Sequence, residues 1–222
     1  MRFRDRRQAG VKLAQELAAY GGRSDVIVLA LPRGGVPVGY EVAMELSAPL
    51  DVFVVRKLGA PHNEELAIGA LASDDICVLD HDTIAQLRIS QVQVADIIGR
   101  EGLELERRDK LYRGARQFPD IRGQVVIVVD DGLATGASMR VAVEALRQKK
   151  PARVIAAAPV ASAQACETLS EIADDCVCVA SPRPFYGVGR WYEDFSQTTD
   201  REVMALLDNA ARRPEGATAG RA

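Results

Sequence analysis

The sequence predicts an α/β fold in which a parallel sheet of about five strands is flanked by helices. Apolar runs that do not alternate with polar residues predict strands at residues 25–31, 51–55, 125–129, 152–160 and 176–180. A run that is apolar on both faces indicates a strand buried on both faces. Helical patterns lie between most of these runs, and strands that alternate with helices form a parallel sheet covered on both sides.

The composition suits one soluble globular domain with a small added lobe. The chain has 222 residues, of which 48% are hydrophobic and 27% charged. A net charge of −3 gives no electrostatic case for nucleic acid. No apolar run predicts a membrane span or a secretory signal. The four cysteines, Cys77, Cys166, Cys176 and Cys178, do not form a zinc pattern. Cys176 and Cys178 share a face of a predicted strand and are expected to be core thiols, for which a reducing cytoplasm is the expected setting.

The N-terminal part predicts two helices on either side of a strand and a glycine turn. Residues 5–20 form the first helix, which should end at a pair of glycines. The first strand then runs into Arg33, Gly34 and Gly35, and a helix over 36–46 follows. Adjacent glycines let main-chain N–H groups face an anion without a Cβ in the way, and Arg33 adds a positive charge. A plain tight turn is the alternative interpretation.

Two cations stand where the second strand should end. Arg56 and Lys57 follow the run 51–55, and ligands of open α/β sheets bind at the carboxyl ends of strands. The polar stretch 58–65, which contains Gly and Pro, predicts a loop. A hairpin of residues 67–71 and 76–79 and a helix from a capping box at Ser90 to about Arg113 complete this region.

The most informative stretch runs from Val125 to Ser138. Its strand is followed by two acids and a loop of mostly small residues: Asp130, Asp131, Gly132, Ala134, Thr135, Gly136, Ala137 and Ser138. Such a loop before a helix binds phosphate through main-chain N–H groups and the helix N-terminus. The acids would repel a phosphate, so they fit hydroxyl groups or a Mg²⁺ ion carried by the ligand. A phosphate beside a diol describes a ribose 5-phosphate, and an ordinary loop with a structural Asp pair is the alternative.

The C-terminal part breaks the alternation. After a helix at 162–173 and the last strand, the segment 181–200 holds five aromatic residues, Phe185, Tyr186, Trp191, Tyr192 and Phe195. Clustered aromatics indicate a structural lid, a contact between two copies of the chain, or a platform for a ligand. A capping box that begins at Thr199 predicts a last helix over 200–211. The tail at 212–222 is expected to be disordered.

Three of these motifs together resemble type I phosphoribosyltransferases. The run from Val125 to Ser138 resembles their motif for 5-phosphoribosyl 1-pyrophosphate (PRPP). The glycine turn at 33–35 resembles their pyrophosphate loop, and R-K-x-G at 56–59 resembles the start of a mobile loop that closes over the ribose. The motifs occur in the expected order within about residues 25–180. The whole chain, including Y-E-D-F-S-Q-T-T-D near its end, looks like a bacterial group whose acceptor is unassigned.

The resemblance implies the fold and the domain boundaries. A single phosphoribosyltransferase domain is expected over 1–211, with a core at about 25–180. A small hood from about 1–22 plus 181–211 would cover the base, because family members often place such a segment, with Val, Gly and an aromatic, after the last core strand.

The resemblance also implies the activity. A 5-phosphoribosyl group would pass from PRPP to a nitrogenous base or related acceptor, with release of pyrophosphate and with Mg²⁺ as cofactor, in nucleotide salvage. The residues implied to bind PRPP are Arg33, Gly34, Gly35, Asp130, Asp131, Gly132, Ala134, Thr135, Gly136, Ala137 and Ser138, and the two acids would also meet the Mg²⁺ that PRPP carries. Arg56 and Lys57 are implied in catalysis, and Tyr186, Trp191 and Tyr192 in covering the base.

One departure from the family concerns the proton acceptor. Members that act on 6-oxopurines have an acid just before the T-G of the motif, where this chain has Ala134. Glu64 or Glu65 in the expected loop could take that catalytic role, although plain solvation is the alternative for exposed acids.

Two other functions remain open. The chain could be a PRPP-binding regulator without turnover, or a hydrolase that uses water as the acceptor. A regulator usually needs a separate element for nucleic acid, and the N-terminal helix is too short to be one. The pair Arg56 and Lys57 favours turnover, because ribose phosphate alone would not need it.

Overall fold

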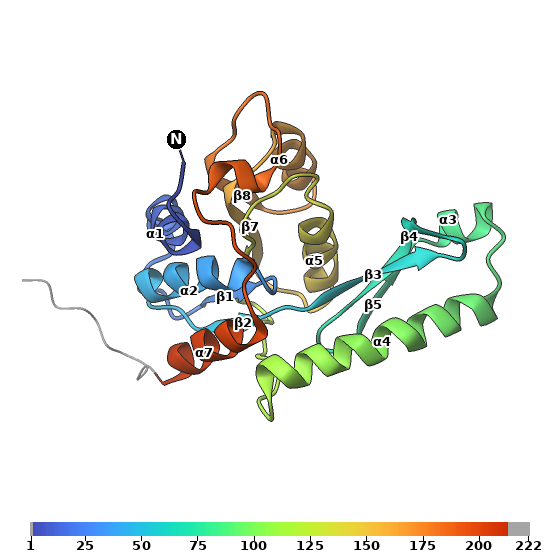
Figure 1. The fold of residues 1–222 in the computed structure, drawn as a ribbon. Helices are drawn as coiled ribbons and strands as arrows, with labels where there is room; N and C mark the ends of the chain where they lie inside the picture. Colours follow the sequence, from blue (N-terminus) through green and yellow to red (C-terminus); the bar gives the residue numbers. More distant parts are fainter. Residues whose placement is uncertain (1, 213–222) are drawn as a thin grey trace, which may run out of the picture.

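The core of the protein is a five-stranded parallel sheet, which confirms the predicted fold class. The computed structural model describes residues 2–212. The strands lie in the order β2 (Leu50–Val52), β1 (Val26–Ala30), β6 (Val125–Val129), β7 (Arg153–Val160) and β8 (Asp175–Ala180) (Figure 1). The chain places β2 on one side of β1 and the later strands on the other, so the order reverses between β1 and β6. Ligands of such sheets bind at the carboxyl ends of the strands beside this reversal.

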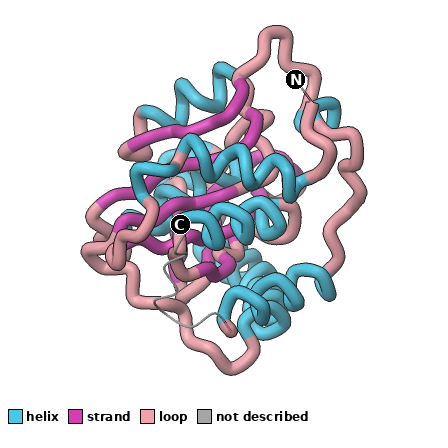
Figure 2. The backbone as a smooth tube through the Cα atoms, turned by 90° about the vertical axis from the view of Figure 1, so that its left-hand side faces the viewer, coloured by secondary structure: helices cyan, strands magenta, loops and turns pink. Residues whose placement is uncertain are grey.

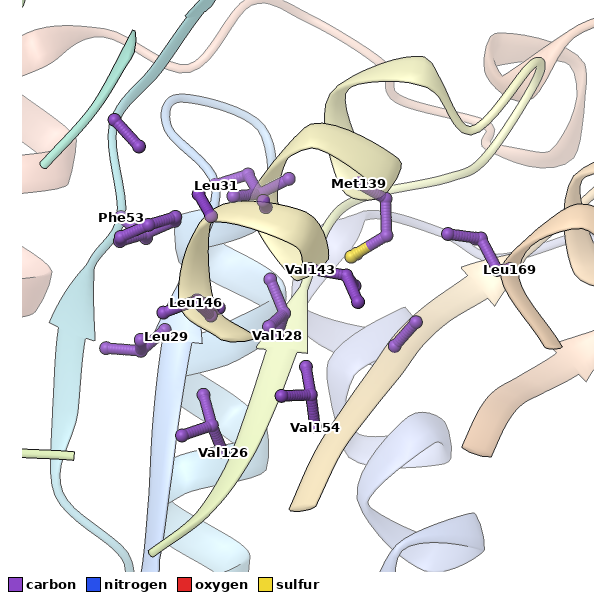
Figure 3. Close-up of a cluster of buried hydrophobic side chains, with 14 of the residues drawn as sticks. Leu29, Leu31, Phe53, Val126, Val128, Met139, Val143, Leu146, Val154 and Leu169 are labelled. Atoms are coloured by element: carbon purple, nitrogen blue, oxygen red, sulfur yellow. The ribbon is translucent and has the colours of Figure 1, made fainter. Parts of the chain in front are cut away.

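Helices cover both faces of the sheet because its strands are apolar on both faces. Two helices pack on each face: α1 (Arg6–Glu16) and α2 (Gly35–Leu46) on one, and α5 (Ala137–Arg147) and α6 (Ala163–Ser170) on the other. Helices lie over the strands in the turned view of Figure 2. Successive residues of β1 alternate between the two layers, with Val26 and Val28 packing among α1 and α2. Leu29 packs with Val143 and Leu146 of α5 (Figure 3).

A second, antiparallel sheet belongs to an arm that extends from the core (Figure 1). The arm consists of β3 (Val55–Ala60), β4 (Asn63–Ala72), β5 (Ile76–Leu79), α3 (His81–Gln86) and the long helix α4 (Gln91–Arg113). Leu58 and Ile68 of the sheet share a buried cluster with Ile97 of α4. The hairpin predicted at 67–71 and 76–79 is confirmed as the pair β4 and β5.

The predicted strand at 51–55 is wrong at its carboxyl end. The core strand β2 stops at Val52, and β3 begins at Val55 in the other sheet. Arg56 and Lys57 therefore lie inside a strand of the arm and not at the carboxyl end of a core strand. The apolar run continues across the break because Phe53 and Val54, which join the two sheets, are also buried.

The predicted loop at 58–65 is also wrong, because most of it belongs to the hairpin of β3 and β4. Ala60 pairs with Asn63 across a two-residue turn, and the ladder continues back to Val55. Leu58 and Ala60 are buried on one face of β3 while their neighbours are more open. A sheet that buries one face on α4 and exposes part of the other, which also reaches α5, accepts the polar residues that suggested a loop.

The sequence patterns did not predict α3, and the other helices agree with the predictions except at their ends. Capping boxes are confirmed at Ser90, before α4, and at Thr199, before α7 (Asp200–Ala211). The first helix is shorter than predicted, because α1 ends at Glu16 and a 3-10 turn, η1 (Ala18–Tyr20), follows. Of the tail predicted to be disordered, residues 213–222 lie outside the described part of the chain. Across residues 2–212, each helix is too short or too polar to cross a membrane.

Residues 2–5 and 181–199 lie side by side and form a small unit, called the hood below. It is smaller than the predicted hood of about 1–22 plus 181–211, because α1 packs on the core sheet and α7 packs in a cluster with α4. The hood contains a second 3-10 turn, η2 (Val188–Trp191). Phe3 and Tyr192 form a parallel bridge between the two segments, and their ring centroids are 5.5 Å apart. Both side chains are 1% exposed and share a buried cluster with Ala9 of α1 and Val160 of β7, so the hood packs on the core.

Candidate functional site

The acid pair lies at the carboxyl end of β6, beside the reversal in strand order. The N–H of Asp131 donates to Oδ1 of Asp130 at 2.8 Å. Burial, and then the neighbouring charge of Asp131, raise the pKa of Asp130. Burial also raises the pKa of Asp131, whereas the guanidinium of Arg6 opposes that rise. Two carboxylates this close together favour a partner that brings hydroxyl donors or positive charge.

The glycine turn after β1 packs directly against the acid pair. The N–H of Leu31 donates to the carbonyl of Val129 at 2.9 Å and joins the ends of β1 and β6. A Cβ on Gly34 would lie 2.0 Å from Oδ2 of Asp131, and a Cβ on Gly35 would lie 2.6 Å from the carbonyl oxygen of Val129. No side chain fits at these distances, so the two glycines let the main chain of the turn reach the acids. The expected pyrophosphate loop and the expected ribose site are therefore neighbours.

The loop of small residues joins β6 to α5. Gly136 has a φ of +72°, a conformation that favours glycine, and α5 begins at the next residue. Four residues around it are exposed, namely Ala134, Thr135, Ala137 and Ser138. These residues leave the N-terminus of α5 exposed, and within the loop the N–H of Ala137 donates to Oγ1 of Thr135 at 3.3 Å.

The turn between β7 and α6 supports this loop from behind. Oγ of Ser162 donates to the carbonyl of Ala134 at 2.6 Å, and the N–H of Ser162 donates to the carbonyl of Leu133 at 2.8 Å. The N–H of Leu133 in turn donates to the carbonyl of Val160 at 2.9 Å. These bonds fix the path of the loop through a neighbouring strand.

An arginine of the N-terminal helix reaches the acid pair. Nε of Arg6 donates to Oδ2 of Asp131 at 2.8 Å, and its Nη1 donates to the carbonyl of Ser196 in the hood at 2.6 Å. Its guanidinium carbon lies 4.1 Å from the ring centre of Phe195. The side chains of Arg6 and Asp131 are only 11% and 15% exposed, so their ion pair is largely removed from water.

Arg33 of the glycine turn faces the start of the last helix. Its Nη1 lies 3.8 Å from Oδ1 of Asp200, and the same oxygen accepts a hydrogen bond from the hydroxyl of Tyr112 at 2.6 Å. Burial, and then the bond to Asp200, raise the pKa of Tyr112 to about 12. Because Tyr112 lies near the end of α4, one carboxylate connects the glycine turn with the arm.

The four predicted catalytic residues lie in the arm. Arg56 pairs with Glu101 of α4, and Lys57 is exposed on β3. Glu64 is exposed near the hairpin turn, and the side chain of Glu65 lies outside the described part of the structure. The catalytic roles of these four residues stay predictions.

The three aromatic residues predicted to cover the base have different surroundings. Tyr192 is buried, its hydroxyl donates to the carbonyl of Asp131 at 2.6 Å, and its ring stacks on Phe195 with centroids 5.0 Å apart. Trp191 packs beside the buried cluster of the hood. Tyr186 is 74% exposed. Tyr192 thus holds the main chain at Asp131, and Tyr186 is an exposed ring with the guanidinium carbon of Arg190 5.8 Å from its centroid.

Sequence reasoning did not single out Arg6, Tyr112, Ser162 or Asp200. Arg6 and Asp131 are 125 residues apart in the chain, so no local spacing connects them. A signal was present for Ser162, since a serine before a helical pattern is a preferred cap. That signal predicts the start of α6, but not the bond to the loop that joins β6 to α5.

A parallel sheet with a glycine turn and an acid pair at its reversal places this chain among the open α/β proteins, whose ligands bind at the carboxyl ends of the strands. The comparison with protein families is more specific. The model of the phosphoribosyl transferase domain matches residues 5–188, and the chain belongs to this family.

Two curated relatives come from Mycobacterium tuberculosis. They are "Putative phosphoribosyl transferase MT0597" of strain CDC 1551 / Oshkosh and "Putative phosphoribosyl transferase Rv0571c" of strain ATCC 25618 / H37Rv. Each is 42% identical over 210 residues, which cover 95% of this chain and 47% of the relative. The chain therefore spans about half the length of these curated relatives.

A solved structure extends the similarity to the fold of the whole chain. The crystal structure of TT1426 from Thermus thermophilus has a TM-score of 0.84 and 43% sequence identity. The match covers 93% of this chain and 98% of that chain. The similarity of fold therefore extends over nearly all of both chains.

Proposed function

We propose that this protein binds PRPP at the reversal between β1 and β6 and transfers the 5-phosphoribosyl group to a nitrogenous base or a related acceptor, with release of pyrophosphate. The observation that carries the proposal is the packing of Gly34 on Asp131. This packing brings a turn suited to an anion against carboxylates suited to sugar hydroxyls. Membership of the phosphoribosyl transferase domain family supports the same reaction.

Each part of PRPP has a matching group of residues in this proposal. Asp130 and Asp131 accept hydrogen bonds from the ribose hydroxyls. The main-chain N–H groups of residues 134–138, at the N-terminus of α5, hold the 5-phosphate. The glycine turn at 33–35 takes the pyrophosphate through its N–H groups and the guanidinium of Arg33.

Mg²⁺ is the cofactor that the family implies. Among the residues that the structure describes, no three or more His, Cys, Asp and Glu side chains gather in a way that could hold a metal ion. Asp130 and Asp131 supply two carboxylates, which fit an ion that arrives with PRPP and keeps phosphate and water ligands. Such an ion would neutralise charge on the pyrophosphate.

The chemistry that these residues support is mainly electrostatic. Displacement at C1 of the ribose passes through an oxocarbenium-like state in which negative charge grows on the leaving pyrophosphate. Groups placed in advance around that charge stabilise the transition state more than the ground state. The turn at 33–35 is held in place by its packing on Asp131 and Val129. Glu64 and Glu65 remain the predicted proton acceptors.

The proposal is tested by binding and then by turnover. PRPP with Mg²⁺ should raise the unfolding temperature of the wild-type protein. The variant Asp130→Asn with Asp131→Asn should lose most of that protection, because each lost hydroxyl acceptor costs roughly 1–3 kcal/mol. Pyrophosphate release is then measured against a panel of nucleobases and against water. Equal protection of the variant and the wild type would contradict the assignment of the ribose site.

A second function, PRPP binding without turnover, is favoured by one observation. Arg56, a predicted catalytic cation, is paired with Glu101 in the arm. A protein that only senses PRPP would need the acid pair and the phosphate loop, but not this cation at the pyrophosphate. Protection by PRPP together with no pyrophosphate release for any acceptor, water included, would favour the sensor over the enzyme.

A further inference from the structure

We propose that Arg6 is a positioning residue of this site, which acts on ribose binding through Asp131 and does not itself touch the sugar phosphate. The inference rests on the proposed function, since it assumes that the acid pair accepts ribose hydroxyls. It assigns a role to α1, which lies outside the three motifs of the family.

Three directed contacts hold the guanidinium of Arg6 in one place. Its Nε bonds Oδ2 of Asp131, its Nη1 bonds the carbonyl of Ser196, and its face stacks on Phe195. The guanidinium is planar and rigid, so bonds along two of its edges and a ring against its face fix its orientation. A lysine at this position could supply the charge, but not the two bond directions or the stacking.

The carboxylate of Asp131 needs such a partner because of its surroundings. It stands beside a second carboxylate, and it packs on the main chain at Gly34. Arg6 engages Oδ2, and in this proposal Oδ1 is the oxygen that accepts the sugar hydroxyl. The main-chain carbonyl of the same residue accepts a bond from the hydroxyl of Tyr192. Asp131 is thus fixed at both its side chain and its backbone.

A purely structural role is the competing explanation, because Arg6 also joins α1 to the hood through Ser196 and Phe195. The two roles differ in one measurable way. If Arg6 acts through the carboxylate of Asp131, removing that carboxylate should remove the effect of Arg6 on ligand affinity. If Arg6 only anchors the hood, its effect should persist when Asp131 is changed.

The experiment is a double-mutant cycle read out by calorimetry with ribose 5-phosphate in a Mg²⁺-free buffer. Arg6→Gln should weaken binding roughly tenfold or more, as expected for a misplaced hydrogen-bond acceptor. In the Asp131→Asn background, Arg6→Gln should change the affinity by less than about twofold. Arg6→Lys should recover only a minor part of the loss. Arg7→Gln, an exposed neighbour on the same helix, is the matched control and should bind like wild type.

Each outcome decides between the explanations. An equal loss in both backgrounds, or full recovery by Arg6→Lys, would overturn the positioning role while leaving the proposed function intact. If the wild-type protein binds neither ribose 5-phosphate nor PRPP, the proposed function itself fails and the role of Arg6 fails with it. Melting curves confirm folding, and if Arg6→Gln does not fold, Arg6→Lys in the two backgrounds completes the same cycle.

Discussion

The contact between the glycine turn and the acid pair predicts that Gly34→Ala will disrupt the site. Gly34 has φ −60° and ψ −34°, which alanine adopts without strain. The added Cβ would stand 2.0 Å from Oδ2 of Asp131, and that separation must grow to at least 3.4 Å to reach ordinary contact. Because Arg6 holds the same oxygen, either the ion pair breaks or the turn lifts away from β6.

Both ways of relieving the contact have a measurable result. We expect a loss of about 1–3 kcal/mol in the free energy of unfolding, as for overpacking of a filled site. Displacement of the turn by about 1 Å should reduce turnover on the order of 100-fold. Denaturant unfolding, calorimetry with pyrophosphate and pyrophosphate release measure these effects. Wild-type stability together with wild-type pyrophosphate affinity in Gly34→Ala would refute the reasoning.

Gly99→Ala is the matched control for this substitution. Gly99 lies in the middle of α4, and a Cβ there would meet nothing within 4 Å. Alanine in the middle of a helix is preferred over glycine by about 0.5–1 kcal/mol. The control should therefore be slightly more stable than wild type, with unchanged affinity for pyrophosphate, so a loss of affinity in both variants would point to a general effect of the substitution.

Two further predictions concern the phosphate loop and the arm. Ser162→Ala removes the hydroxyl that caps α6 and bonds the phosphate loop. It should cost about 1–2 kcal/mol of stability in denaturant unfolding and weaken ribose 5-phosphate binding in calorimetry; unchanged affinity would show that the loop needs no such support. Arg56→Ala with Lys57→Ala should lower kcat/KM by a factor that corresponds to a loss of roughly 3 kcal/mol or more of transition-state stabilisation. The affinity for ribose 5-phosphate should stay nearly unchanged, because the two cations act on the charge that grows on the pyrophosphate in the transition state. An equal loss in both measurements would place the two cations in ground-state binding.

The core of the fold and most of the site motifs could be predicted because their signals are local. The apolar run of β6, the acids at its end and the small residues before α5 occupy fourteen consecutive positions, from Val125 to Ser138. Each step follows from the residues beside it: burial on both faces, then the end of the strand, then a helix start. The structure confirms the strand and the helix.

The arm could not be predicted in the same way, because its strands depend on distant partners. The stretch 58–65 forms a hairpin and not a loop because β3 and β4 pair with each other and because α4 buries one face of the sheet. The contacts of Arg6 are even harder to predict from the sequence, because its partners Asp131 and Ser196 are 125 and 190 residues away in the chain. The burial of Tyr192, one of the residues predicted to cover a base, depends in part on Phe3 near the N-terminus.

The position of the arm in the sequence still limits where its cations can lie. The chain leaves the core sheet at Val52 and enters the arm at Val55, so Lys57 is five residues beyond the end of β2. Five residues span at most about 18 Å even when fully extended, and β2 lies next to β1, which carries the glycine turn. Arg56 and Lys57 are therefore tied to the carboxyl edge of the sheet by a short piece of chain, although they belong to another sheet.

In the proposed function, a small change in the position of the arm would alter the distance of these two cations from a pyrophosphate at the turn. The acid pair and the loop at 134–138 would stay with the core. This difference explains why ribose 5-phosphate affinity and turnover should respond separately to substitutions in the arm.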